Sequence, residues 1–231
     1  LSPKMANIAD ITELLSAGRF DEGFLAVGMN ENSSYLVALY GLTGMKNDSK
    51  KIFFPREPGG KLVEIELRQA GDKRPLYYPL VVRNNGLIIG NGEHTRAIER
   101  AMTGKSVLES LDDIDYSSYS DNLFRIGAYL SKDEAVIARA YSTAGETSNK
   151  WSVPLIAGEL SFISASTIEP VRVELKSYSK VLTTPVGATG ILYSALNRAD
   201  SEGVGVVAVY KGIGETNGIL YAVRDSDGLK S

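Results

Sequence analysis

The sequence contains no cysteine and only one histidine among its 231 residues. The lack of cysteine excludes disulfides, thiolate metal sites and cysteine nucleophiles. A single histidine excludes a metal site built from several imidazoles, whereas a carboxylate site for a hard cation stays open. The nucleophile elbow G-x-S-x-G, the dinucleotide fingerprint and the Walker loop are absent as well, so these common motifs assign no chemistry.

An excess of positive charge and long apolar runs are also lacking. The net charge is -3, and no stretch has the Lys/Arg footprint that duplex nucleic acid requires, so we expect no nucleic-acid partner. No apolar run approaches the roughly 20 residues of a membrane helix. The first ten residues lack the basic and then apolar pattern of a signal peptide. We therefore expect a cytoplasmic protein that does not enter a membrane.

Short apolar runs with the alternation of β-strands dominate the chain. "NNG" between two of them predicts a hairpin, and Pro79 predicts an edge position or a bulge. Helical spacing predicts helices at 8–17, from near Thr95, at 106–113 and at 187–199. We expect strands at 23–29, 34–41, 51–54, 61–67, 77–83, 87–90, 125–130, 134–142, 158–164, 169–176, 204–210 and 218–224, and a loop at 142–152. This order predicts one α+β domain over 1–231, with layered antiparallel sheets and packed helices.

The stretch "LIIGNGEHT" at 87–95 is the first candidate site. A strand that ends in Gly-Asn-Gly lets a backbone approach a ligand closely, and the start of the next helix favours an anion. Asn91, Glu93, His94 and Thr95 are the polar side chains of this turn. The alternative is a tight strand-to-helix turn in which Thr95 is the N-cap and His94 is a satisfied surface group.

Two further segments carry polar and charged residues. In 113–129, Arg125 stands at a strand entry and can bind phosphate or carboxylate with its planar fork, or can pair with the nearby aspartates. The loop at 43–51 carries three lysines, which could meet a phosphate or form a solvated turn. The glycine-rich "GIGETNG" lies between two predicted strands, so a hairpin loop is favoured over a phosphate loop.

Taken in order, these segments resemble the archaeal-type inosine monophosphate (IMP) cyclohydrolase family. The likeness covers roughly residues 18–130, and it depends on the order and spacing of several motifs. These are Gly18-Arg19-Phe20 with 23–28, the strand and basic loop at 34–51, Tyr77-Tyr78-Pro79, the turn from Gly90 to Arg96, Asp115-Tyr116-Ser117, and 122–126.

The resemblance implies the αββα fold of N-terminal-nucleophile hydrolases, without self-processing. It also implies closure of the ring of 5-formamidoimidazole-4-carboxamide ribotide to inosine monophosphate in purine biosynthesis, with loss of water. This activity is a cyclohydrolase activity on C–N bonds of a cyclic amidine. It needs no metal and no organic cofactor, because the enzyme must only orient two groups, move protons and stabilise an oxyanion. The resemblance and the many flat strands favour a homo-oligomer.

The resemblance also implies roles for individual residues. Tyr78 matches the family tyrosine, a candidate proton shuttle. Substrate-binding positions match Asn91, Gly92, Thr95, Asn122 and Arg125.

Several positions depart from the family pattern. Met45 stands where the family has an arginine, Ser117 where it has an acidic residue, Leu123-Phe124 where it has Thr-Pro, and Arg96 where it has an aspartate. We expect Lys46 to supply the lost positive charge, and Glu93 or His94 to take the place of the carboxylate, which makes all three catalytic candidates. The alternatives are a divergent member that acts on another nucleotide-like substrate and one that only binds it.

Overall fold

A computed structural model describes residues 8–17, 23–44, 51–59, 62–92, 94–101, 125–140, 149–164, 167–177, 180–198, 202–214 and 218–231. The helices are α1 (Ile11–Ala17), α2 (His94–Ala101) and α4 (Pro185–Arg198). The strands are β1 (Ala9–Asp10), β2 (Phe24–Met29), β3 (Tyr35–Gly44), β4 (Lys51–Gly59), β5 (Leu62–Gln69), β6 (Pro75–Arg83), β7 (Gly86–Gly90), β8 (Arg125–Leu130), β9 (Ala135–Ala140), β10 (Asn149–Ser152), β11 (Glu159–Ser164), β12 (Val171–Glu174), β13 (Lys176–Ser177), β14 (Lys180–Val181), β15 (Glu202–Gly212), β16 (Ile219–Asp225) and β17 (Gly228–Lys230).

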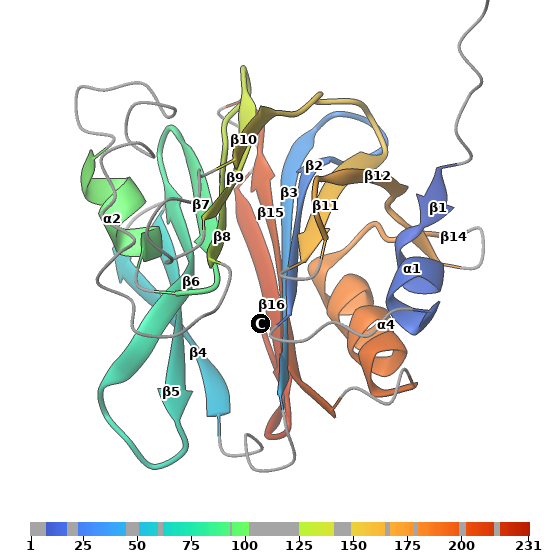
Figure 1. The fold of residues 1–231 in the computed structure, drawn as a ribbon. Helices are drawn as coiled ribbons and strands as arrows, with labels where there is room; N and C mark the ends of the chain where they lie inside the picture. Colours follow the sequence, from blue (N-terminus) through green and yellow to red (C-terminus); the bar gives the residue numbers. More distant parts are fainter. Residues whose placement is uncertain are drawn as a thin grey trace, which may run out of the picture.

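The strands form two large sheets that pack face to face (Figure 1). Sheet A has the order β1-β12-β11-β2-β3-β15-β16-β17, and sheet B has the order β10-β9-β8-β7-β6-β5-β4. Sheet B is one continuous antiparallel meander, whereas sheet A takes strands from both ends of the chain. The pairing of β1 with β12 is parallel, and the other pairings within the two sheets are antiparallel.

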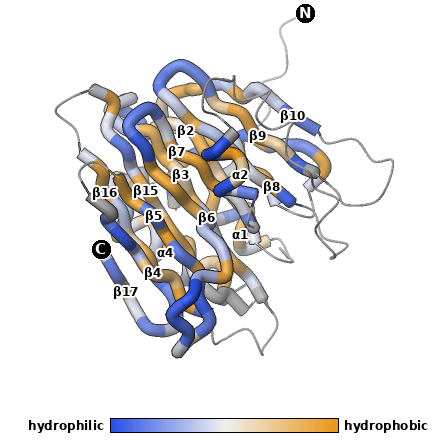
Figure 2. Tube along the Cα trace, turned by 90° about the vertical axis from the view of Figure 1, so that its left-hand side faces the viewer, coloured by the Kyte–Doolittle hydropathy of each residue, from blue (hydrophilic) through white to orange (hydrophobic). Residues whose placement is uncertain are grey.

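Three apolar clusters account for the layers. The largest lies between the sheets and includes Leu25 and Tyr40 of sheet A with Ile65 and Ile89 of sheet B. The second packs α1 and α4 on the outer face of sheet A, and the third packs α2 on sheet B through Ile98. Hydrophobic residues follow the strands, and hydrophilic ones gather at the turns (Figure 2). The helix–sheet–sheet–helix layering confirms the predicted α+β class.

Several local predictions are confirmed. The "NNG" hairpin joins β6 to β7, and "GIGETNG" lies between the paired strands β15 and β16. Ile65 pairs with Leu80 while Leu67 pairs with Tyr77, so two steps on β5 match three on β6. This is the bulge predicted from Pro79. The helix predicted at 8–17 begins only at Ile11, because the Oδ1 atom of Asp10 accepts the Thr12 backbone N–H at 2.8 Å and caps it.

Two local predictions are wrong. Residues 149–152 were expected in a loop but form β10, in which Trp151 pairs with Ile137 of β9. Thr95 is not an N-cap, because α2 already begins at His94. The predicted helix at 106–113 and residues 142–148 of the expected loop lie outside the described residues.

Candidate functional site

The turn after β7 is joined to the start of β8 by its own side chains. The Asn91 backbone N–H donates to the carbonyl oxygen of Ile126 at 3.1 Å. The Oδ1 atom of Asn91 accepts the Ile126 backbone N–H at 2.8 Å. These two hydrogen bonds, one from the backbone and one to the side chain of Asn91, extend the β7–β8 ladder beyond Gly90. The Asn91 side chain is buried. Asn91 therefore holds the turn in a fixed place relative to β8.

His94 is buried in the same turn. Its exposed fraction is 1%, so the alternative in which His94 is a satisfied surface group is wrong. The Nε2 atom lies 2.9 Å from the carbonyl oxygen of Ile126. Because a carbonyl can only accept, we assign the proton to Nε2. Burial, together with the charge of Arg125, lowers the pKa of His94 to about 4 although the bond to Ile126 raises it. The imidazole is thus neutral at pH 7.

The glycines around this turn make room for the imidazole. An ideal Cβ on Gly90 would lie 2.7 Å from the Thr95 Oγ1 atom and 2.9 Å from His94 Nε2. A Cβ on Gly92 would lie 3.0 Å from His94 Nδ1, and one on Gly127 would lie 3.4 Å from His94 Nε2. A Cβ atom at Gly90 would therefore clash with its neighbours, and one at Gly92 or Gly127 would be in tight contact with the imidazole. The space that the sequence assigned to a ligand at Gly90 is therefore filled by the protein's own His94 and Thr95.

Arg125 reaches the turn from the first position of β8. Its Nη1 atom lies 3.4 Å from the position that a Cβ on Gly92 would occupy. Thr95 closes the other side, since its backbone N–H and its hydroxyl both donate to the Gly92 carbonyl oxygen, at 3.2 and 3.0 Å. The structure thus brings together four of the residues expected to bind substrate, namely Asn91, Gly92, Thr95 and Arg125.

Tyr78 stands on the outer face of sheet B because of the bulge at Pro79. Its neighbour Tyr77 points inward and shares a hydrogen bond of 2.9 Å with the hydroxyl of Tyr40. The Tyr78 ring lies under the Arg96 guanidinium, with Cζ 3.9 Å from the ring centroid. Arg96 follows Thr95 directly, so Tyr78 contacts the helix start at the candidate turn. Lys46, Glu93 and Asn122 lie outside the described residues, as do Met45 and Ser117.

The strand register places the turn after β7, the start of β8 and the start of β6 at one end of the sandwich. Gly90 pairs with Gly127, and Arg125 pairs with Ala140, so β7 ends where β8 begins and β9 ends. The start of β4 pairs with the end of β5, which in turn adjoins the start of β6. Of the basic loop predicted at 43–51, the structure describes only the two ends, which close β3 and open β4.

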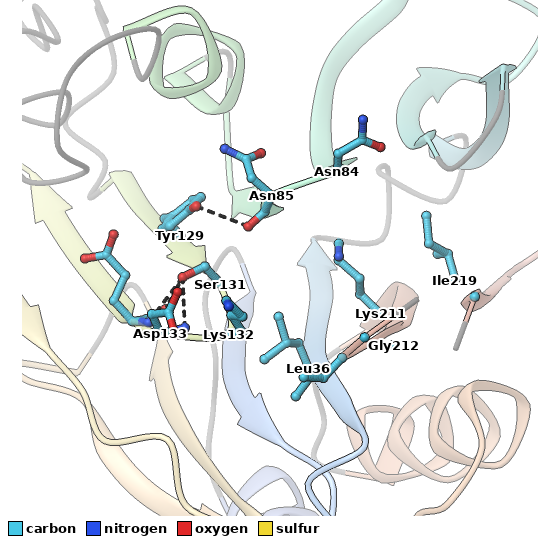
Figure 3. Close-up of a pocket in the computed structure, with 14 residues that line it drawn as sticks. Leu36, Asn84, Asn85, Tyr129, Ser131, Lys132, Asp133, Lys211, Gly212 and Ile219 are labelled. Atoms are coloured by element: carbon cyan, nitrogen blue, oxygen red, sulfur yellow. Dashed lines mark hydrogen bonds between the residues drawn. The ribbon is translucent and has the colours of Figure 1, made fainter. Parts of the chain in front are cut away.

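A cleft of about 690 Å³ lies at the opposite end (Figure 3). It is formed by the tips of hairpins from both sheets. Asn84 and Asn85 stand on one side, and Leu36 and Lys211 stand on the other. Burial raises the pKa of Tyr129 in its wall, and the nearby acidic side chains add to this effect. The predicted hairpins at "NNG" and between 204–210 and 218–224 border this cleft, but their local sequences do not show that they meet.

Comparisons with known proteins add no assignment. No family model matches the sequence, and no curated protein matches it either. Within the part of the chain that the structure describes, no helix is long and apolar enough to cross a membrane. The same residues contain no group of three or more histidine, aspartate or glutamate side chains that could hold a metal ion.

Proposed function

We propose that this protein is a cyclohydrolase that closes the ring of 5-formamidoimidazole-4-carboxamide ribotide to inosine monophosphate. The observation that carries the proposal is the position of the Arg125 guanidinium beside the turn. A permanent cation lies against Gly92, and Asn91 and His94 fix that turn to β8. The order of family-like motifs along the chain and the four-layer fold support the same reading.

The reaction balances without an external reactant. The carboxamide nitrogen forms a bond to the formyl carbon, and the bond between that carbon and its oxygen breaks. The oxygen leaves as water with one hydrogen from the carboxamide nitrogen and one from the formamido nitrogen. Both reacting groups belong to one substrate, so the protein gains most by orienting them and by stabilising the negative charge that develops on oxygen.

In this proposal, individual residues have separate roles in the chemistry. Arg125 supplies a planar fork for the phosphate or for the oxyanion. Tyr78 moves a proton, and Lys46 and Glu93 supply the charges that Met45 and Ser117 lack. His94 is buried and neutral, and it donates to a backbone carbonyl, so in this proposal it positions the turn and takes no proton from the substrate.

The test is to add the formamido ribotide to the purified protein and follow ultraviolet absorbance as inosine monophosphate forms. A rate well above the spontaneous one is expected. Arg125→Gln should reduce kcat/KM by roughly 100-fold, in line with the loss of one charge-stabilising group. Arg172→Gln is the matched control, because Arg172 pairs with Glu159 on sheet A, whereas the turn follows β7 of sheet B.

A second candidate is a divergent family member that acts on another nucleotide-like substrate. Arg96 favours it, because this residue covers one face of Tyr78 where the family carries an aspartate. A thermal-shift screen separates the two. A shift with a related heterocyclic ribotide and none with inosine monophosphate supports the second candidate, and equal shifts count against it.

A further inference from the structure

Four charged side chains form a closed ring between α2 and sheet B. Arg83 Nη2 lies 2.7 Å from Glu64 Oε1, and Arg96 Nη2 lies 2.8 Å from Glu64 Oε2. Arg96 Nη1 lies 2.5 Å from Glu99 Oε2, and Arg83 pairs with Oε1 of the same glutamate. Each carboxylate therefore gives one oxygen to each arginine, and the charges alternate around the ring.

The ring is largely shielded from solvent. The exposed fractions of its four side chains range from 9% for Glu64 to 25% for Arg83. Burial alone would raise the pKa of Glu64, yet hydrogen bonds from Arg83 and Arg96 hold that pKa below its ordinary value. Glu64 therefore stays charged at neutral pH, and the ring links β5, β6 and α2.

The two arginines of the ring differ in one respect. Both terminal nitrogens of Arg96 are bonded to carboxylates, and the guanidinium face rests on the Tyr78 ring. The carboxylates thus set the plane of the guanidinium, which in turn sets the plane of the phenol. They also neutralise the cation that replaces the family's aspartate. Arg83 binds the same two glutamates and makes no stacking contact that the structure describes.

We propose that Arg96 is a positioning residue that fixes the side chain of Tyr78 at the candidate site. The role in turnover rests on the proposed function, whereas the contact itself does not. A simpler account is that the ring only docks α2 on the sheet. That account predicts that Arg83→Gln and Arg96→Gln have the same effects, because each change breaks the ring. Positioning predicts that only the change at Arg96 acts on Tyr78.

The first experiment is ¹⁹F NMR on protein labelled with 3-fluorotyrosine. The chain has 12 tyrosines, and the signal of Tyr78 is identified as the one that Tyr78→Phe removes. We expect Arg96→Gln to move or broaden this signal more than Arg83→Gln does. Arg96→Lys keeps the charge but loses the planar fork, so it should change the Tyr78 signal less than Arg96→Gln does. It replaces Arg96→Gln in the comparison if the glutamine variant does not fold. Equal changes in the Arg83 and Arg96 variants overturn the proposal.

The second experiment compares kcat and KM for the formamido ribotide. Arg96→Gln should lower kcat by roughly tenfold with little change in KM, because a misplaced reacting group costs rate. Arg83→Gln should leave kcat within about threefold. An unchanged kcat in Arg96→Gln overturns the positioning role. Wild-type protein without turnover refutes the proposed function instead, and the NMR comparison then still decides whether Arg96 fixes Tyr78.

Discussion

Lowering the pH from 7 to 4 is expected to destabilise this protein through His94. The imidazole is buried and donates from Nε2 to Ile126, so the fold favours its neutral form. The unfolded chain takes up a proton at a pKa of about 6.5. The folded chain resists protonation until the pH approaches about 4. Stability from this group is therefore fully present above about pH 6.5 and is lost as the pH falls towards 4.

The size of the effect follows from the two pKa values. Each tenfold change in proton affinity corresponds to about 1.4 kcal/mol. A fall of the pKa from 6.5 to about 4 thus corresponds to roughly 3 kcal/mol of unfolding free energy that depends on His94. Carboxylates titrate in the lower part of the same range, so a variant without the imidazole is needed. His94→Gln keeps an amide donor for Ile126 and does not titrate.

The assay uses the fact that the chain has one histidine. Its Cε1–H proton gives one imidazole signal in NMR, whose titration should show a pKa near 4. Urea unfolding of wild type and His94→Gln at several pH values should give a stability difference that shrinks by roughly 3 kcal/mol between pH 7 and pH 4. A measured pKa of 6 or above, or a difference that does not vary with pH, would refute the assignment of a buried neutral imidazole.

Two further predictions concern packing and a buried carboxylate. Gly90→Ala should lower the free energy of unfolding by about 1–3 kcal/mol, because its Cβ would meet the side chains of the turn. Gly218→Ala is the control, since no atom lies within 4 Å of its Cβ, and it should lower this free energy much less. Urea unfolding of both variants measures the difference. Asp225→Ala should cost about 3 kcal/mol, or a Tm loss of roughly 6–12 °C, because its buried carboxylate accepts the Phe53 N–H at 2.8 Å across the two sheets. Asp227→Ala is the exposed control and should shift the Tm by less than about 2 °C.

Much of the fold could be predicted because its signals are local. Alternating apolar residues marked the strands, and the "NNG" and "GIGETNG" segments marked the hairpins that the pairings confirm. Helical spacing marked α4 to within two residues of its start. Pro79 predicted an edge position or a bulge, because proline cannot donate to a ladder, and the structure has the bulge. The assignment of strands to two sheets could not be predicted, because it depends on pairings between distant parts of the chain.

The surroundings of the candidate site show the same limit. Glu64 and Glu66 alternate along β5 with Val63, Ile65 and Leu67 of the core, so they lie on the other face of sheet B. Both are nevertheless buried, because arginines from β4, β5, β6 and α2 cover them. His94 is likewise buried by Gly127 and Ile126, which lie more than 30 residues further along the chain. The spacing of residues along one strand shows which face each side chain takes. It does not show whether that side chain is buried, because the side chains that cover it come from other elements.

The most direct test of the proposed function is the conversion of 5-formamidoimidazole-4-carboxamide ribotide by the wild-type protein and by Arg125→Gln, followed by ultraviolet absorbance. The proposal predicts formation of inosine monophosphate well above the spontaneous rate, and a loss of roughly 100-fold in kcat/KM when Arg125 is replaced. Far-ultraviolet circular dichroism establishes that both proteins are folded. A folded wild-type protein that does not exceed the spontaneous rate would contradict the proposal.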